Sequence, residues 1–266
     1  MSTQKNQGSV LPISNAIVFV LIFAVALLLF FFVFGSSSNL DEHGHAKPGN
    51  YMGMIYMGGF VVPVLFTLLI STFVFTIERA LSLAKAAGGK DVDGFLKKIV
   101  QSLESNDIEE ARRLCDVQKG TIANVTLSGV DAYDEMSKNS HLDAEHKVLS
   151  IQKSMEETTA LEVPMLSKNM SILSTIATIA TLAALIGTVI GMIKSFAALG
   201  AAGAPDQTQL AVGISEALIN TALGIGTSFF AILFYNYFNS NIDGMTYKMD
   251  EAQFLISQTF ASRSQN

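Results

Sequence analysis

The sequence predicts an all-α, polytopic membrane protein, and three observations support this fold class. Half of the 266 residues are hydrophobic and 15% are charged, and the mean hydropathy is +0.40. These values depart from those of soluble domains toward those of membrane proteins. The apolar residues also cluster in four runs: residues 16–34, 51–77 and 169–193 contain no charge, and residues 210–238 contain only Glu216. Each run is long enough to cross ~30 Å of hydrocarbon as a helix, so four spans are expected.

The charge balance and the single cysteine exclude several classes of function. A net charge of -6 and a pI near 5.2 argue against nucleic acid as a partner, because phosphate backbones are bound by basic surfaces. Cys115 is the only cysteine, so neither an intramolecular disulfide nor a cysteine metal cluster can form, and a reducing compartment is indicated.

The first apolar run, within residues 1–50, is expected to be a retained membrane anchor followed by a polar link. A cleaved signal peptide is the alternative, but the run is longer than the usual apolar core of such peptides. His43 and His45 in the link form a pair that a metal ion can use, although two histidines in a loop of this composition are more often a solvated connector.

Orientation follows from the positive charges after the second run. Lysines and arginine crowd the chain just past that membrane exit, at Arg79, Lys85, Lys90, Lys97 and Lys98. The positive-inside rule therefore predicts a cytoplasmic location for this side. The expected segments are a second span at 51–78, a cytoplasmic helical domain at 79–169, a third span at 170–199, an outer turn and fourth span at 200–238, and a cytoplasmic tail at 239–266.

The cytoplasmic segment is predicted to be helical. Apolar residues recur at helical spacing at Phe95, Leu96, Ile99, Val100 and Leu103. Asn106 or Asp107 is expected to cap a further helix. Residues 142–186 contain no glycine and a single proline, Pro164, so one long helix is predicted to rise from the cytoplasm into the third span, with a bend near that proline.

The third run carries a stripe of small polar side chains. Steps of three or four residues place the following on one helix face: Ser171, Ser174, Thr178, Thr181, Leu185 and Thr188. Threonine in a membrane helix often bonds its own backbone, so a packing stripe remains an alternative to a functional face.

The fourth run carries Glu216, Asn220 and Thr227 on one side, with Thr221 on the flank. A charged acid near mid-membrane costs about 3 kcal/mol, so this face is expected to meet water or a protein partner, and burial makes a carboxyl group a plausible proton exchanger. Alternatively, Glu216 lies near the outer interface and reaches water. No second carboxylate lies in the four runs, so protons carried across would need an ionisable group from another chain.

Small residues in the last two runs indicate close helix packing. Gly187 and Gly191 form a G-x-x-x-G pair, and Gly224 keeps the fourth run narrow.

These two runs together resemble a known family. Residues 187–193 read GTVIGMI and are followed by Ser195-Phe196; residues 214–224 read ISEALINTALG, and Tyr235-Asn236 closes the run. This two-part pattern resembles the MotA/TolQ/ExbB proton channel family, and is most similar to ExbB and TolQ. The resemblance extends from about Gly58 to the tail.

The resemblance implies a homopentameric ring whose last two spans, 170–199 and 200–238, line a central pore. The pore would hold the single-span helices of an ExbD-like partner dimer, which supplies an aspartate. By position, Thr188 and Thr221 match the pore threonines and Glu216 matches the family's glutamate. Protons would be the coupling ion, with no cofactor, in the bacterial inner membrane, and work would pass to a TonB-like protein.

Two departures from the family pattern concern pore geometry. Thr181 and Phe230 stand where relatives commonly have proline, which predicts straighter pore helices. The added first span is atypical for ExbB.

The leading hypothesis is an ExbB-type motor subunit that energises TonB-dependent outer-membrane transport. A TolQ-like or motility-type stator subunit is an alternative within the family, and a non-conducting helical scaffold is an alternative outside it. An enzyme is not expected, because the cytoplasmic segment contains no nucleophile-base pattern, phosphate-binding glycine loop or metal-ligand cluster.

Overall fold

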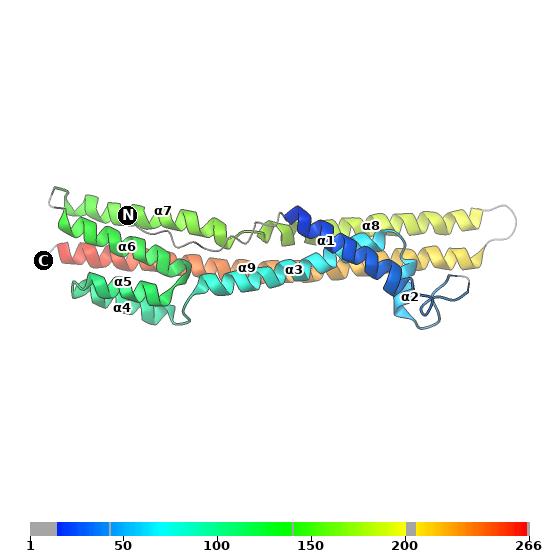
Figure 1. Ribbon diagram of the computed structural model, residues 1–266. Coiled ribbons are helices and arrows are strands. Elements are labelled where there is room, and N and C mark those ends of the chain that lie inside the picture. The colour runs from blue at the N-terminus through cyan, green and yellow to red at the C-terminus, as the bar shows by residue number, and fades with distance from the viewer. Residues whose placement is uncertain (1–14, 43, 140, 201–205, 265–266) are drawn as a thin grey trace. The chain divides into compact units, whose positions relative to one another are not determined.

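The computed structural model describes residues 15–264 apart from 43, 140 and 201–205, and what it describes is almost entirely helical (Figure 1). The predicted all-α class is confirmed for these residues, whose only β feature is an isolated bridge between Leu40 and Ala46. The elements are α1 (Asn15–Leu28), the π-helix η1 (Leu29–Phe34), α2 (Tyr51–Met57), α3 (Val61–Ala87), α4 (Val92–Glu104), α5 (Ile108–Gln118), α6 (Gly120–Lys138), α7 (Ala144–Leu166), α8 (Met170–Gly200) and α9 (Gln207–Ser264).

Four helical stretches are long and apolar enough to cross a membrane. They are α1 with η1, and parts of the stretches that contain α3, α8 and α9. The prediction of a multi-pass membrane protein is thereby confirmed by length and composition.

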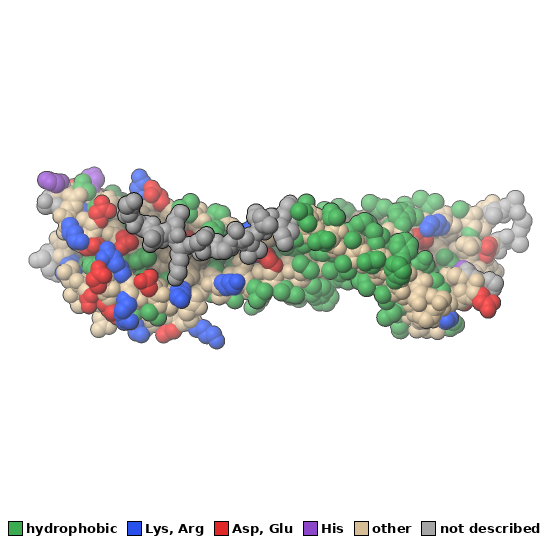
Figure 2. Space-filling view, in the orientation of Figure 1, with side chains coloured by type: hydrophobic (Ala, Val, Ile, Leu, Met, Phe, Trp, Pro, Cys, Tyr) green, Lys and Arg blue, Asp and Glu red, His purple; other side chains and the backbone are tan. Residues whose placement is uncertain are grey.

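The chain divides into two compact units. The apolar unit comprises the residues up to Phe75 together with Ile172–Leu233, and the charged unit comprises Thr76–Ser171 with the chain from Phe234 onward. Helices α3 and α9 each contribute to both. On the face that Figure 2 shows, hydrophobic side chains dominate the first unit, whereas lysine, arginine and acidic side chains gather on the second.

In the apolar unit the first helical stretch packs along α3 with one face. Its buried residues recur every four positions, at Ile22, Ala26, Phe30 and Phe34. Phe30 and Phe34 pack on Val62. Most of the other large apolar side chains of this stretch are exposed, as expected for a helix whose outer face meets lipid, and Val18, Phe19, Leu27 and Leu29 are half-buried.

The second apolar run is not one helix from residue 51. It is divided into α2 and α3, so the continuous helix begins at Val61 rather than Tyr51. The break is a turn in which Gly59 has a φ of 76°. This left-handed conformation is strained for residues with a Cβ atom but open to glycine. Gly58, the C-cap of α2, and Gly59 therefore terminate this helix.

The predicted single helix over residues 142–186 is also wrong. Residues 167–169 separate α7 from α8, and Asn169 has a φ of 61°. The expected bend near Pro164 is thus a complete interruption that begins three residues later. The buried Arg79 stabilises the end of α7, because its Nη1 donates a hydrogen bond to the Leu166 carbonyl at 3.3 Å. Its Nε donates to Glu78 at 2.8 Å.

Two further predictions for the charged unit are confirmed: a helix that contains residues 95–103, and a helix that begins after residue 106 or 107. Helix α4 buries Phe95, Leu96, Ile99 and Leu103, while Val100 is only half-buried. Of the two predicted caps for the next helix, Asp107 is the N-cap of α5, since its side chain accepts a hydrogen bond from the Glu110 amide at 3.0 Å.

Cys115 is buried in α5, and burial raises the pKa of its thiol to about 12. Because the thiolate is the reactive form, we expect Cys115 in the folded protein to react with a disulfide reagent such as DTNB far more slowly than a free cysteine. Addition of guanidinium chloride should release one thiol per chain at the normal rate. Rapid reaction of the folded protein in mild detergent would contradict this placement.

Candidate functional site

The last two apolar helices bring two threonine hydroxyls into contact. The Oγ1 atoms of Thr188 on α8 and Thr221 on α9 lie 2.6 Å apart. The carbonyl four residues earlier in the same helix lies within hydrogen-bond distance of each hydroxyl, at 2.9 Å for Thr188 and 3.0 Å for Thr221, so one hydroxyl donates to its carbonyl and the other donates to its partner hydroxyl. Both side chains are half-buried. Thr181, two turns along α8, does not take part, since among the described residues its hydroxyl bonds only the Ala177 carbonyl, at 3.5 Å.

Much of the polar stripe of α8 is exposed in the single chain. Ser174, Thr178 and Leu185 are exposed, while Thr181 and Thr188 are half-buried. Packing within one chain therefore does not explain this stripe. A polar face in a membrane helix is costly against lipid and favourable against protein or water.

Glu216 lies on a different face, inside the apolar unit. Its side chain is 3% exposed, and both carboxylate oxygens accept hydrogen bonds of 2.7 Å from the Nζ of Lys194 on α8. The Lys194 side chain is 52% exposed, so the ion pair joins a buried carboxylate to a partly accessible ammonium. Glu216 therefore does not simply reach up to water, as the alternative interpretation of the sequence required.

Lys194 was not predicted from the sequence as a functional residue. It lies one position beyond the charge-free run 169–193, although inside the expected third span at 170–199. A signal was present: residues 194 and 216 lie at comparable distances along the chain from the ends of the two helices, Gly200 and Gln207. In an antiparallel helix pair such positions face each other at a similar depth.

The break between α2 and α3 packs directly against this ion pair. The Nδ2 of Asn220 donates a hydrogen bond of 2.9 Å to the Gly58 carbonyl. A Cβ atom on Gly59 would collide with Oε1 of Glu216. We call Gly58, Gly59, Lys194, Glu216 and Asn220 the acid anchor, because they hold the carboxylate of α9 against the start of α3.

The sequence-predicted face of α9 is therefore divided among different roles. Glu216 and Asn220 belong to the acid anchor, and Thr221 pairs with Thr188. Thr227 is buried, and its hydroxyl bonds the Leu223 carbonyl at 2.8 Å. The side-chain oxygen Oδ1 of Asn220 is buried and has no hydrogen-bond partner among the described residues. It is therefore an acceptor that a water molecule would satisfy.

The glycines lie where α8 and α9 approach most closely. A Cβ on Gly187 would come within 2.7 Å of the Asn220 side chain, and one on Gly191 within 2.6 Å of the Gly213 carbonyl. A Cβ on Gly224 would collide with Ala184. Both helices continue without interruption through Thr181 and Phe230, the positions where the family pattern suggests proline.

The predicted histidine pair of the link is only partly described, because His43 lies outside the described residues. Among the residues that the structure does describe, no three histidine, cysteine, aspartate or glutamate side chains gather at one place.

Taken together, the helices and the site define a polytopic α-helical membrane protein with a buried ion pair and a hydroxyl pair on its last two apolar helices. The family model for the MotA/TolQ/ExbB proton channel family matches residues 119–251, which is half of the chain. The chain belongs to this family of membrane proton channels, which is not a class of enzymes.

Two curated relatives are of ExbB type. The biopolymer transport protein ExbB of Pseudomonas putida is 28% identical over 156 residues, covering 58% of this chain and 46% of that protein. The biopolymer transport protein ExbB-like 3 of Synechocystis sp. is 35% identical over 88 residues, covering 32% of this chain and 42% of that protein. The chain thus aligns with less than half the length of either relative.

Gly59→Ala should destabilise the protein more than Gly49→Ala, because only the first adds a steric collision. Both glycines have positive φ values, 76° and 77°, but a Cβ on Gly49 meets nothing within 4 Å. The backbone conformation alone costs ~1–2 kcal/mol for a residue with a Cβ. Thermal unfolding in detergent should therefore show a small decrease for Gly49→Ala and a larger one for Gly59→Ala. Equal decreases would mean that Glu216 does not lie on Gly59.

Lys194→Met should lower stability by about 2–3 kcal/mol, because it leaves the buried Glu216 carboxylate without its hydrogen-bond donor. Glu216→Gln alone should also destabilise. The double variant should be more stable than the sum of the two losses predicts, by roughly 1–3 kcal/mol, as expected for residues in direct contact. Thermal unfolding of the four proteins in the same detergent measures this coupling, and strictly additive losses would contradict the ion pair.

Proposed function

We propose that this chain is the ring-forming subunit of a motor driven by the proton-motive force, of ExbB type, which works with an ExbD-like single-span partner and a TonB-like protein to energise outer-membrane transport. Protons are the coupling ion, and no cofactor takes part. The observation that carries the proposal is the exposed, hydroxyl-bearing face of α8 beside the Thr188–Thr221 pair.

Several copies of the chain would cover this face. Leu185, Ile186, Val189 and Ile193 are exposed on α8 in the single chain, next to the polar stripe. A surface on which apolar and hydroxyl groups alternate suits helix packing around a closed axis better than contact with lipid alone. In this proposal the ring is a homopentamer with the partner dimer in its central pore, as the resemblance to the family implies.

The proton-carrying acid belongs to the partner in this proposal. Glu216 is the only carboxylate in the fourth apolar run, and it is paired with Lys194. We therefore assign Glu216 the role of a fixed charge that orients α9, while Thr188 and Thr221 face the partner's aspartate. An elementary charge that moves down a membrane potential of 100 mV releases ~2.3 kcal/mol. This free energy is available to drive a rearrangement of packed helices.

The proposed location is the bacterial inner membrane, with the C-terminus and residues 79–169 in the cytoplasm. The lysines that follow the second apolar run support this orientation through the positive-inside rule.

A TolQ-like or motility-type stator would use the same pore residues with a different load. The genes beside this one distinguish these possibilities: a TonB-like neighbour favours uptake, and Tol-like or motility neighbours favour the others. A non-conducting scaffold is the outcome that the next experiment tests.

Thr188→Val should reduce transport driven by the proton-motive force by about tenfold or more, because loss of one productive hydrogen bond of ~1.4 kcal/mol corresponds to a factor of ten. Thr221→Val should reduce transport to a similar extent. Thr67→Val is the matched control, since its buried hydroxyl also bonds its own backbone, at 2.7 Å from the Pro63 carbonyl, but on α3.

The measurement is energised uptake in cells that express the chain with its single-span partner, and native mass spectrometry of the purified complexes provides the subunit count. We expect intact pentamers for all three variants and lost transport for the first two. Full transport with Thr188→Val and Thr221→Val would favour the scaffold, and a monomer would contradict the ring.

A further inference from the structure

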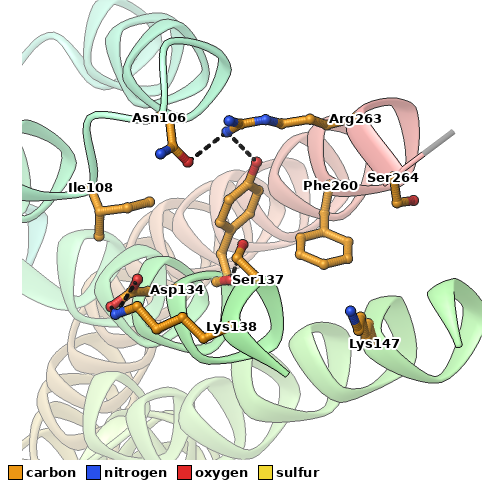
Figure 3. A pocket seen from close by; sticks show the side chains of 10 residues that line it. Asn106, Ile108, Asp134, Ser137, Lys138, Lys147, Phe260, Arg263 and Ser264 are labelled. Carbon is orange, nitrogen blue, oxygen red and sulfur yellow. Dashed lines mark hydrogen bonds and ion pairs between the residues drawn. The ribbon is translucent and has the colours of Figure 1, made fainter. Parts of the chain in front are cut away.

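A cavity of about 450 Å³ lies in the charged unit and includes none of the residues of the acid anchor or the threonine pair. It is lined by residues of the α4–α5 turn, α5, α6, α7 and the last turns of α9 (Figure 3). This volume lies within the range of ~300–1,000 Å³ that is typical of small-molecule sites.

The charged side chains of this cavity are mostly basic, although the whole chain has a net charge of -6. Lys138, Lys147 and Arg263 line it together with a single acid, Asp134. Lys138 forms an ion pair with Asp134 at 2.8 Å, and the same carboxylate also pairs with Arg112 at 3.0 Å, so Lys138 already has an anionic partner. Neither Lys147 nor Arg263 forms an ion pair with any carboxylate of the described chain. Two positive charges therefore remain available.

The guanidinium of Arg263 is held in place through one of its three nitrogens, Nη1. Its Nη1 donates hydrogen bonds to the Leu103 carbonyl at 3.1 Å and to Oδ1 of Asn106 at 2.8 Å. The same nitrogen lies 3.5 Å from the hydroxyl of Tyr133. Nε and Nη2 form no hydrogen bond within the part of the chain that the structure describes. A preorganised guanidinium with a free donor edge is the geometry that recognises oxyanions.

An aromatic wall completes the cavity. The rings of Tyr133 and Phe260 meet edge to face, with centroids 5.0 Å apart. Both side chains are buried, so their positions are fixed by packing. Figure 3 shows Phe260 on the same side of the cavity as Lys147, with Arg263 reaching in from the next turn of α9. A fixed apolar surface beside free cationic donors suits a ligand with an anionic head and a planar or apolar body.

We propose that this cavity binds a small organic phosphate of about mononucleotide size, with its phosphate between Lys147 and Arg263 and its body against Phe260. A phosphate monoester carries about -1.5 to -2 charges at neutral pH, which matches the two uncompensated cations. A single carboxylate would leave one of them unpaired. This proposal is independent of the function proposed for the apolar unit.

Isothermal titration calorimetry of the full-length protein in detergent tests the proposal with GMP, guanosine and inorganic phosphate as probes. We expect saturable binding of GMP, competition by inorganic phosphate, and much weaker binding of guanosine. Lys147→Gln should weaken GMP binding by about tenfold or more, because it removes a charge-assisted hydrogen bond. Lys153→Gln is the matched control, since Lys153 is an exposed lysine of the same helix that does not line the cavity.

Arg263→Gln should weaken binding as well, but it also removes the hydrogen bond to the Leu103 carbonyl and can therefore lower stability. Lys147→Gln keeps the test decisive, because the Lys147 side chain forms no hydrogen bond with the rest of the described chain. Equal binding of GMP and guanosine, unchanged binding by Lys147→Gln, or the absence of saturable binding of both GMP and phosphate would each overturn the proposal.

Discussion

The carboxylate of Glu216 lies within the apolar unit, and its neighbours are arranged around the need to accommodate that charge. An isolated charge in such surroundings is unfavourable by several kcal/mol, so it must be paired and hydrogen-bonded. Lys194 supplies both hydrogen bonds, at 2.7 Å each. Gly59 leaves the space that Glu216 occupies, and Asn220 ties the adjacent Gly58 carbonyl to α9. The start of α3 and the two last apolar helices are thereby joined at one point.

This arrangement separates two roles that a helical wheel places close together. The carboxylate is directed into the subunit, whereas the Thr188–Thr221 pair lies at the half-buried edge of a face that the single chain leaves exposed. A charge that is fixed by a lysine is suited to orienting a helix, and hydroxyl groups without a charge of their own are suited to receiving a partner's acid. A ring of such subunits would hold its helices rigidly while presenting a polar lining to a foreign helix.

Elements that depend on local sequence patterns were predicted correctly. Features that depend on contacts between distant segments of the chain were not. Clustered apolar runs identified the spans, and the spacing of Leu96, Ile99 and Leu103 identified α4. The positive φ values of Gly59 and Asn169, which divide two predicted helices, depend on packing and hydrogen bonds from other parts of the chain. Lys194 was missed for a similar reason: its role exists only once α8 and α9 pack antiparallel, which a single-helix pattern does not contain.

The contact between Lys194 and Glu216 can be measured directly by solid-state NMR of the protein in lipid bilayers, with 15N-labelled lysine and 13C-labelled glutamate. We expect a strong dipolar coupling between one lysine Nζ and one glutamate Cδ, and its loss in Lys194→Met. A spectrum in which no lysine nitrogen lies near the Glu216 Cδ would contradict the acid anchor, and with it the proposed role of Glu216.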